Sequence, residues 1–244
     1  LETLKQIGSD SVDSVITSPP YYQLRDYGFN EQWGLESDYK DYLNKMVNLM
    51  RELKRVLKPT GTMWINLGDT YSSKTKGTGG MNSNKLKSKD NNNFQAFRSM
   101  TKTNTEVLDK SLMLIPHRFA IRCIDELGLI LRNDIIWAKP NGMPESVTDR
   151  FSKKHEFVFF FVKNQEYYFD LDSIRDKQRE SSLQRAHYAT PTLKGDGYRN
   201  LANPKTAQQT YNKILDGVGK NPGDVSDFWE ITTKPNSKNH YATY

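Results

Sequence analysis

The feature that most constrains the fold is a short apolar run that stops at two prolines. Residues 12–16 are rich in β-branched side chains, and the sequence TSPPYY follows them directly at 17–22. Such a run predicts a buried strand, and prolines end it in a rigid loop because they fix φ and lack an N–H. Open α/β sheets bind ligands at the carboxyl ends of their strands, so we expect this loop to lie in a binding site.

The chemistry of this loop suits the holding of a planar nitrogen group. The carbonyls around Pro19 and Pro20 are outward-facing acceptors, and Ser18 adds a hydroxyl acceptor beside them. Tyr21 adds a flat face on which a base could stack. Two acceptors and a stacking surface predict a clamp for an exocyclic amino group.

Strand and helix patterns alternate along much of the remaining chain, which predicts a three-layer α/β sheet. The expected helices cover residues 38–57 and 116–127, and the expected strands cover 62–67, 129–137 and 155–162, with 167–171 as a hairpin partner of the last strand. The four phenylalanines of the strand at 155–162 are expected to lie in the core.

Two segments interrupt this pattern. Residues 72–112 are rich in Ser, Thr, Asn, Gly and Lys, which predicts a mobile basic insertion, either merely solvated or settling on phosphates. In residues 181–228 basic and aromatic side chains interleave, a mixture suited to contacts with phosphates and bases. We interpret this segment as a target-recognition lobe, with an irregular surface lobe as the alternative.

The composition limits which partners, location and metal sites are expected. A formal net charge of +6 is compatible with a polyanion but does not prove one. The chain has no apolar run long enough to span a membrane and no signal peptide, so an intracellular protein is expected. One cysteine and four scattered histidines provide no metal-ligand spacing, so no metal is expected.

The proline loop, taken with five further segments, resembles the DNA amino-methyltransferases, whose signature after a strand is Ser, Asp or Asn followed by Pro-Pro-Tyr or Pro-Pro-Phe. The further segments are LRDYG at 24–28, GLE at 34–36, LGD at 67–69, IWAKP at 136–140 and PESVTDR at 144–150. Together they cover most of the chain in one order. The resemblance is to the beta class, in which this signature precedes the cofactor motif.

The resemblance implies a Rossmann-like enzyme that transfers a methyl group from S-adenosylmethionine to an amino group of a base flipped out of double-stranded DNA. Serine at the first signature position favours cytosine N4, with adenine N6 as the alternative. Cys123 is not preceded by proline, so methylation of cytosine carbon is not expected. The setting implied is restriction-modification or regulation in the cytoplasm of a prokaryote, or a phage-encoded enzyme.

The resemblance and the loop chemistry together assign candidate residues. The catalytic candidates are Ser18, Pro19, Pro20 and Tyr21, and the cofactor candidates are Thr17, Thr243 and Tyr244. The candidates for DNA contact are Tyr22, Arg25, Lys139, Arg150, Lys153, Arg185 and Arg199, with ordinary solvated charges as the alternative for the cations beside the sheet. Asp69 follows a strand and is expected to be either a cleft residue or a cap.

The family's Gly-rich segment of Asp-Pro-Phe-x-Gly-Ser-Gly type does not occur in the sequence. We therefore expect a sequence trimmed before its cofactor motif, or a second polypeptide that supplies this motif, and weak or no binding of S-adenosylmethionine by these 244 residues alone. The expected divisions are catalytic parts at 1–71 and 113–180, the insertion at 72–112, the lobe at 181–228 and the start of the cofactor side at 229–244. A methyltransferase acting on RNA or protein glutamine and an inactive DNA-binding subunit remain alternatives.

Overall fold

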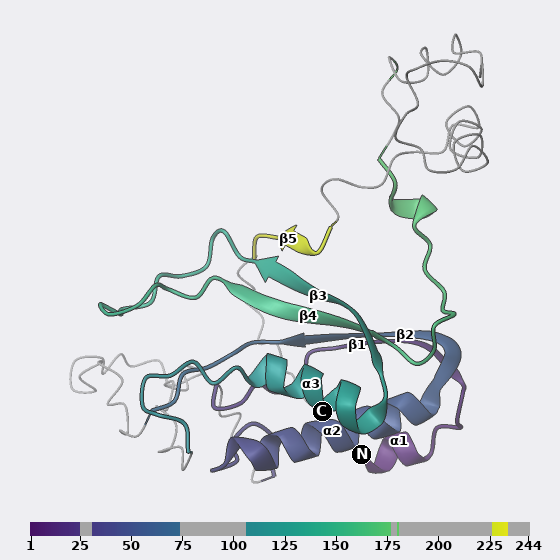
Figure 1. Cartoon of the computed structure of the whole chain (residues 1–244), viewed down its shortest axis with the longest axis horizontal. Coiled ribbons are helices and arrows are strands. Elements are labelled where there is room, and N and C mark those ends of the chain that lie inside the picture. Colours follow the sequence, from purple (N-terminus) through teal and green to yellow (C-terminus); the bar gives the residue numbers. More distant parts are fainter. Residues whose placement is uncertain (25–30, 74–105, 177–179, 181–225, 234–244) are drawn as a thin grey trace, which may run out of the picture. The chain divides into compact units, whose positions relative to one another are not determined.

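A computed structural model describes residues 1–24, 31–73, 106–176, 180 and 226–233. Its centre is a five-stranded sheet with the order β1-β2-β4-β3-β5 (Figure 1). The strands are β1 (Val12–Thr17), β2 (Leu57–Leu67), β3 (Ile130–Ala138), β4 (His155–Val162) and β5 (Phe228–Glu230). β1 runs parallel to β2, β4 runs antiparallel to both β2 and β3, and β5 runs parallel to β3. The predicted α/β sheet is thus confirmed as a mixed sheet.

The helices of the sheet-containing part lie on one face of the sheet (Figure 1). They are α1 (Glu2–Lys5), α2 (Tyr39–Val56) and α3 (Ile115–Leu127). The Asp38 side chain caps α2 by accepting a hydrogen bond from the Lys40 backbone N–H, and Gly128 ends α3 with a φ of 60° that favours glycine. β2 follows α2 directly and begins at Leu57 rather than at residue 62.

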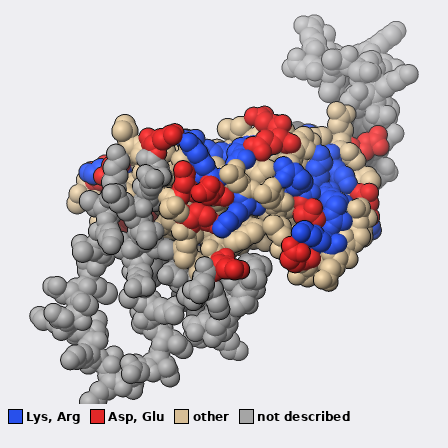
Figure 2. All heavy atoms as spheres, turned by 90° about the horizontal axis from the view of Figure 1, so that it is seen from below, with Lys and Arg blue, Asp and Glu red and all other residues tan. Residues whose placement is uncertain are grey.

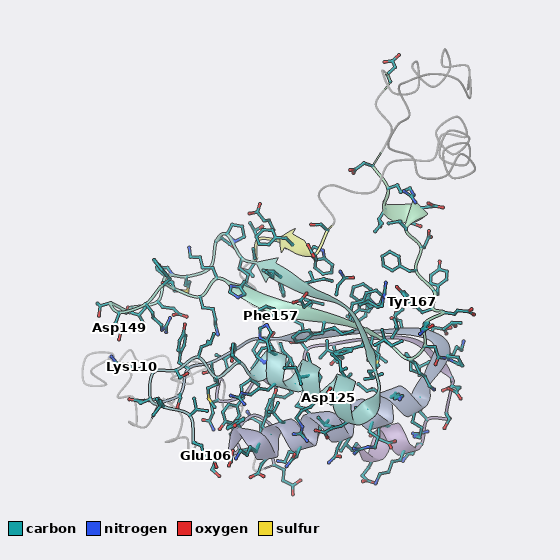
Figure 3. All side chains as sticks on the ribbon, in the orientation of Figure 1. Glu106, Lys110, Asp125, Asp149, Phe157 and Tyr167 are labelled. Atoms are coloured by element: carbon teal, nitrogen blue, oxygen red, sulfur yellow. The ribbon has the colours of Figure 1, made fainter. Side chains whose placement is uncertain are left out.

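The core lies between these helices and the sheet. Met63, Ile65 and Leu67 of β2 are fully buried in one cluster with side chains of α2 and α3. The ring of Phe119 in α3 lies 6.3 Å from that of Phe159 and 6.2 Å from that of Phe161. Phe157, labelled in Figure 3, belongs to the same strand as these two rings. The predicted core role is therefore confirmed for Phe159 and Phe161, whereas Phe157 is partly buried against the core and Phe160 is buried on the opposite face of the sheet.

The opposite face of the sheet carries no helix within the described residues, so these contain two of the three predicted layers. Trp64 stacks on Phe160 there, with ring centroids 4.1 Å apart. Ile16 of β1 is 81% exposed on this face. The strand register pairs Ile16 with Trp64 and Trp64 with Phe160, and residues paired across strands point to the same face. These three side chains therefore lie side by side on the uncovered face.

The prediction of a hairpin between 155–162 and 167–171 is wrong. β4 already pairs with β2 along one edge and with β3 along the other, so no edge remains for a further strand. Residues 167 and 168 instead hydrogen-bond to β2 and β3. The Tyr168 N–H donates to the Thr60 carbonyl of β2 over 2.9 Å, and the Arg132 side chain of β3 donates to the Tyr167 hydroxyl over 2.8 Å.

The chain divides into two compact units, one formed by Leu1–Tyr168 with Asp227–Tyr244 and one by Phe169–Ser226. The described part of the second unit holds one turn of 3-10 helix, Asp172–Ile174. Most of the predicted recognition lobe, residues 181–225, lies outside the described residues, as do residues 74–105 of the predicted insertion.

The two ends of the insertion meet. Tyr71 pairs with Leu112 in an isolated antiparallel bridge, and the Ser72 N–H donates to the Ser111 carbonyl over 2.8 Å. The insertion therefore leaves and re-enters the sheet-containing unit at one place.

The side of this unit that bears α1 and α2 carries charges of both signs, interspersed rather than grouped (Figure 2). Several of these side chains form ion pairs, among them Lys45 with Glu36 and Arg55 with Glu52. No helix among the described residues is long and apolar enough to cross a membrane.

Candidate active site

The loop that follows β1 is held firmly from the helix side. Pro19 is buried, and the Tyr42 hydroxyl of α2 donates a hydrogen bond of 2.9 Å to the Pro20 carbonyl. Tyr22 is 1% exposed, and its ring lies 5.4 Å from that of Tyr42. The two prolines restrict the backbone, and these contacts fix where the loop lies.

The segment containing Gly34 holds the same loop from another side. The Gln23 N–H donates to the Gly34 carbonyl over 2.6 Å, and the Gln23 side chain donates to the Glu36 carbonyl over 2.8 Å. Gly34 has a φ of 91°, and a Cβ there would lie 2.5 Å from the Tyr21 carbonyl oxygen. Only glycine allows this close approach, which gives the GLE segment a physical role in shaping the loop.

Tyr21 is the centre of a polar network that joins three parts of the sheet-containing unit. Its hydroxyl donates to Glu156 Oε2 of β4 over 2.8 Å and accepts from Asn66 Nδ2 of β2 over 2.9 Å. Asn66 Nδ2 also lies 3.1 Å from the same Glu156 oxygen. Lys139, just after β3, forms an ion pair with the other oxygen of Glu156, and both of these side chains are about one-fifth exposed.

The network shifts two ionisation equilibria. Burial raises the pKa of Tyr21, and the nearby charge of Glu156 raises it further, so the phenol keeps its proton. For Glu156 burial acts to raise the pKa, but the hydrogen bonds from Lys139 and Tyr21 and the charge of Lys139 together outweigh it, and the pKa is lowered. The result is a neutral phenol hydrogen-bonded to an ionised carboxylate.

Ser18 and Pro19 carry the two oxygen atoms that the sequence predicts as acceptors. Ser18 is exposed, and its hydroxyl lies 3.3 Å from the Tyr21 hydroxyl, to which it donates. Among the backbone hydrogen bonds of the described loops and turns, none is donated to the Pro19 carbonyl. The end of β1 therefore carries an exposed serine hydroxyl beside a tyrosine whose own hydroxyl is fixed.

The structure corrects one predicted DNA contact. Tyr22 is buried against Tyr42, and its hydroxyl donates to the Ser37 carbonyl over 3.5 Å, so its ring belongs to the core and has no surface for DNA. Tyr22 packs against α2, whereas the hydroxyl of its neighbour Tyr21 reaches Glu156 of β4.

The cations predicted beside the sheet all have partners within the protein. Lys139 pairs with Glu156, and Lys153 donates to the Asp69 carbonyl while burial lowers its pKa. Arg150 pairs with Glu145 and lies over the Tyr71 ring, 3.9 Å from the centroid. Lys139 and Lys153 are thus engaged in contacts within the protein, whereas the Arg150 side chain is about one-quarter exposed.

The other candidates fall in different places. Thr17 ends β1 and pairs in register with Ile65. Residues Arg25, Arg185, Arg199, Thr243 and Tyr244 lie outside the described residues.

Asp69 is a cap. Its Oδ1 accepts from the backbone N–H of Thr70 over 2.8 Å and from that of Ile115, the first residue of α3, over 3.0 Å. The helix begins where a carboxylate satisfies one of its free N–H groups. Of the two readings left open for Asp69, the structure therefore favours the cap.

Sequence reasoning missed Asn66 and Glu156. Both are polar residues in strands whose neighbours are apolar, in WINL at 64–67 and HEFVFFF at 155–161. A polar side chain at such a position requires a partner. That signal could have marked both residues, although not the contact between them.

Comparison with known proteins places this sheet and loop in a family. The chain belongs to the DNA methylase family N6_N4_Mtase, whose model matches residues 12–244. Similar proteins include the Type II methyltransferase M.Cfr9I of Citrobacter freundii, 34% identical over 245 residues that cover 100% of this chain and 66% of the relative. Another is the Type II methyltransferase M.XycI of Xanthomonas campestris pv. cyanopsidis, 42% identical over 177 residues that cover 72% of this chain and 56% of the relative.

The fold is similar to that of a solved enzyme, PvuII DNA methyltransferase (cytosine-N4-specific). The TM-score is 0.51 at 16% identity, over 97% of this chain and 56% of that chain. This likeness confirms the predicted Rossmann-like methyltransferase fold. The chain spans less than two thirds of the length of the curated relatives M.Cfr9I and M.XycI.

Proposed function

We propose that the protein is a DNA methyltransferase that transfers a methyl group from S-adenosylmethionine to an exocyclic amino group, with cytosine N4 as the favoured target. The observation that carries this proposal is the exposed Ser18 hydroxyl at the end of β1 beside an immobilised Tyr21, with the carbonyl of the buried Pro19 as the second proposed acceptor. Membership of the DNA methylase family supports it, and so do the names of the Type II methyltransferase relatives.

The amino nitrogen of a base is a poor nucleophile because its lone pair is delocalised into the ring. Two acceptors that grip its N–H bonds out of the ring plane would localise that lone pair and aim it. S-Adenosylmethionine supplies an electrophilic methyl group on its sulfonium, and positioning then accounts for most of the acceleration. No strong base is needed, because an alkylated amino group with an extra positive charge loses its proton readily.

The target base is proposed to be flipped, because a paired base cannot reach a loop anchored in this way. The Tyr21 hydroxyl is tied to Glu156 and Asn66, which fixes the ring that would support the flipped base. We propose that Arg25, Arg150, Arg185 and Arg199 contact phosphates, with residues 181–228 as the target-recognition lobe. We propose that the enzyme acts in the cytoplasm of a prokaryote and is encoded by that prokaryote or by a phage.

The choice of cytosine rests on serine at the first signature position. The fold neighbour PvuII DNA methyltransferase is described as cytosine-N4-specific, which is compatible with this choice. Adenine N6 is the alternative, because the same two acceptors would grip either amino group.

The described residues fit the part of the site that holds the amino group better than the part that holds the methyl donor. The sequence contains no Gly-rich turn of the family type, and Thr17 is the one cofactor candidate among the described residues. We propose that a segment outside these 244 residues, on the same or another polypeptide, completes the donor pocket. Isothermal calorimetry on the 244-residue chain is expected to show weak or no binding of S-adenosylmethionine, and micromolar binding would contradict this proposal.

The decisive experiment is methyl transfer by the full-length gene product on DNA of mixed sequence, followed by mass spectrometry of the nucleosides. The expected product is N4-methylcytosine. N6-methyladenine would decide for the alternative target. Binding of DNA without any methylated nucleoside would contradict the proposal and identify a DNA-binding subunit, and transfer only to RNA or protein would contradict the DNA substrate.

A matched pair of serine variants separates the acceptor role from loss of folding. Ser18→Ala removes the proposed acceptor, and Ser14→Ala removes another exposed hydroxyl of the same segment, one that meets Thr62 Oγ1 at 3.1 Å. Ser18→Ala is expected to lower kcat about 100-fold or more, whereas Ser14→Ala keeps it within about twofold. Equal activity of the two variants would contradict the role of Ser18.

A further inference from the structure

The Tyr21 hydroxyl collects polar side chains from three parts of the sheet-containing unit. Glu156 from β4, Asn66 from β2 and Ser18 from the loop after β1 lie 2.8, 2.9 and 3.3 Å from it. These contacts gather where β1 and β2 end, on the face of the sheet opposite α2 and α3. Buried polar groups are costly unless they are paired, so a cluster of this kind has to satisfy a consistent set of donors and acceptors.

The hydrogen-bond directions in this cluster follow from the groups present. Lys139 can only donate, and the carboxylate of Glu156 that it pairs with can only accept. The single hydrogen of the Tyr21 hydroxyl therefore points to Glu156, and the Tyr21 oxygen is left to accept. This oxygen accepts two hydrogen bonds, one from Asn66 Nδ2 and one from the Ser18 hydroxyl.

The direction at Ser18 has a chemical consequence. With its hydrogen pointing inward to Tyr21, Ser18 Oγ presents lone pairs to the exposed side of the loop. An N–H group approaching from that side meets an acceptor. If Tyr21 were free to donate to Ser18, the serine hydrogen would instead turn outward and oppose the N–H of a bound base.

We propose that Glu156 is a positioning residue of the methyl-transfer site, which acts through the Tyr21 hydroxyl to keep Ser18 in the acceptor orientation. Lys139 holds Glu156 ionised and in place, and Asn66 completes the set of donors. Glu156 does not touch the substrate. This inference rests on the proposed function. It adds the side chains that keep Ser18 as a hydrogen-bond acceptor for the amino group of the base.

The first test is independent of activity. In the full-length protein labelled with ¹³Cζ-tyrosine, the Tyr21 signal, assigned with Tyr21→Phe, is expected to shift in Glu156→Gln because the carboxylate partner of its hydroxyl is gone. Glu52→Gln serves as the matched control, since it breaks a half-buried ion pair with Arg55 on α2. A Tyr21 signal unchanged in Glu156→Gln would overturn the inference, whether or not the protein transfers methyl groups.

The second test is kinetic. Tyr21→Phe keeps the ring and removes the hydroxyl, and Glu156→Gln keeps the shape and removes the charge. Each is expected to lower kcat about 10- to 100-fold while KM for DNA changes by less than about threefold, and Glu52→Gln is expected to stay at the wild-type level. The double variant is expected to be no slower than the slower single variant, because both changes interrupt one chain of hydrogen bonds.

Two results would overturn the inference while leaving the proposed function intact. One is wild-type kcat in Tyr21→Phe, which would mean that the ring alone matters. The other is multiplication of the two single effects, which would mean that Tyr21 and Glu156 act separately. Failure of the proposed function looks different, because the wild-type protein would then leave DNA amino groups unmethylated.

Discussion

The two faces of strands β2 and β4 are built from alternate residues of the same segments, yet one face is apolar and buried and the other carries a polar network. On the face towards the helices, Ile65, Leu67 and Phe161 are fully buried in the apolar core. On the other face the same strands present Asn66 and Glu156, which hydrogen-bond to each other and to Tyr21 in the loop after β1. One face therefore stabilises the sheet, and the end of the other holds the polar groups of the proposed methyl-transfer site.

This difference separates stability from activity along one strand. Changes on the covered face should alter the free energy of unfolding, and changes at the polar end of the other face should alter turnover. Replacing an exposed side chain at the edge of the uncovered face, such as Ile16 of β1, should change neither the free energy of unfolding nor turnover.

The largest effect is expected for Phe161→Ala. Phe161 is fully buried against Phe119, so its truncation leaves a cavity and should lower the free energy of unfolding by about 3–5 kcal/mol. Ile16→Ala on the exposed face should change it by less than about 0.5 kcal/mol. Urea denaturation followed by circular dichroism measures both, and similar losses for the two variants would break the distinction between the faces.

Tyr21→Ala tests the polar end of the uncovered face. It removes both the supporting ring and the hydroxyl bound to Glu156 and Asn66, and we expect methyl transfer to fall about 100-fold or more, while non-specific DNA binding at low salt persists. Transfer of labelled methyl groups and filter binding measure the two properties. Normal turnover in this variant would remove Tyr21 from the site.

Gly34→Ala is expected to have an intermediate effect through the backbone of the loop after β1. The new Cβ would lie 2.5 Å from the Tyr21 carbonyl oxygen at a positive φ, so we expect a loss of about 1–3 kcal/mol in stability together with reduced turnover. Gly8→Ala is the control, because a Cβ there meets nothing within 4 Å. Thermal unfolding measures both variants. A loss of stability confined to Gly34→Ala would support the role of Gly34 in shaping the loop after β1.

The smallest effect is a pH dependence at Glu156. Its pKa is lowered in the folded state, so its pairing stabilises the fold above the pKa of the unfolded chain, near the ordinary 4.5, and this contribution disappears as the pH falls through the folded pKa. The stability difference between wild type and Glu156→Gln should therefore shrink between pH 6 and pH 3. Denaturation curves across this range measure it, and a constant difference would contradict an ionised Glu156.

Much of the fold was predictable because its signals are local. The periodic apolar residues of α2 and α3 and the apolar runs of β3 and β4 predicted these elements to within a few residues, and the loop at 17–22 was predicted at the end of β1. The hairpin partner at 167–171 was wrong because the sequence does not show that both edges of β4 are already paired.

The site was predictable only in part, for the same reason. Ser18 and Tyr21 stand in one short motif, whereas Glu156 and Asn66 reach the Tyr21 hydroxyl only once the strands have paired. Tyr22 illustrates the reverse error, since a residue beside the motif faces the core. Spacing along a chain places groups near each other, but strand pairing decides which of them meet.

The bridge between Tyr71 and Leu112 ties the two ends of the insertion together, so the part of it at residues 74–105 should tolerate changes in length. Because its two ends are clasped to each other, the cost of closing it grows only slowly with its length, by about 0.6 kcal/mol for each doubling. Related enzymes could therefore lengthen, shorten or replace this stretch without disturbing the strands that carry Tyr21 and its partners, and an epitope or fluorescent label could be placed there for the same reason.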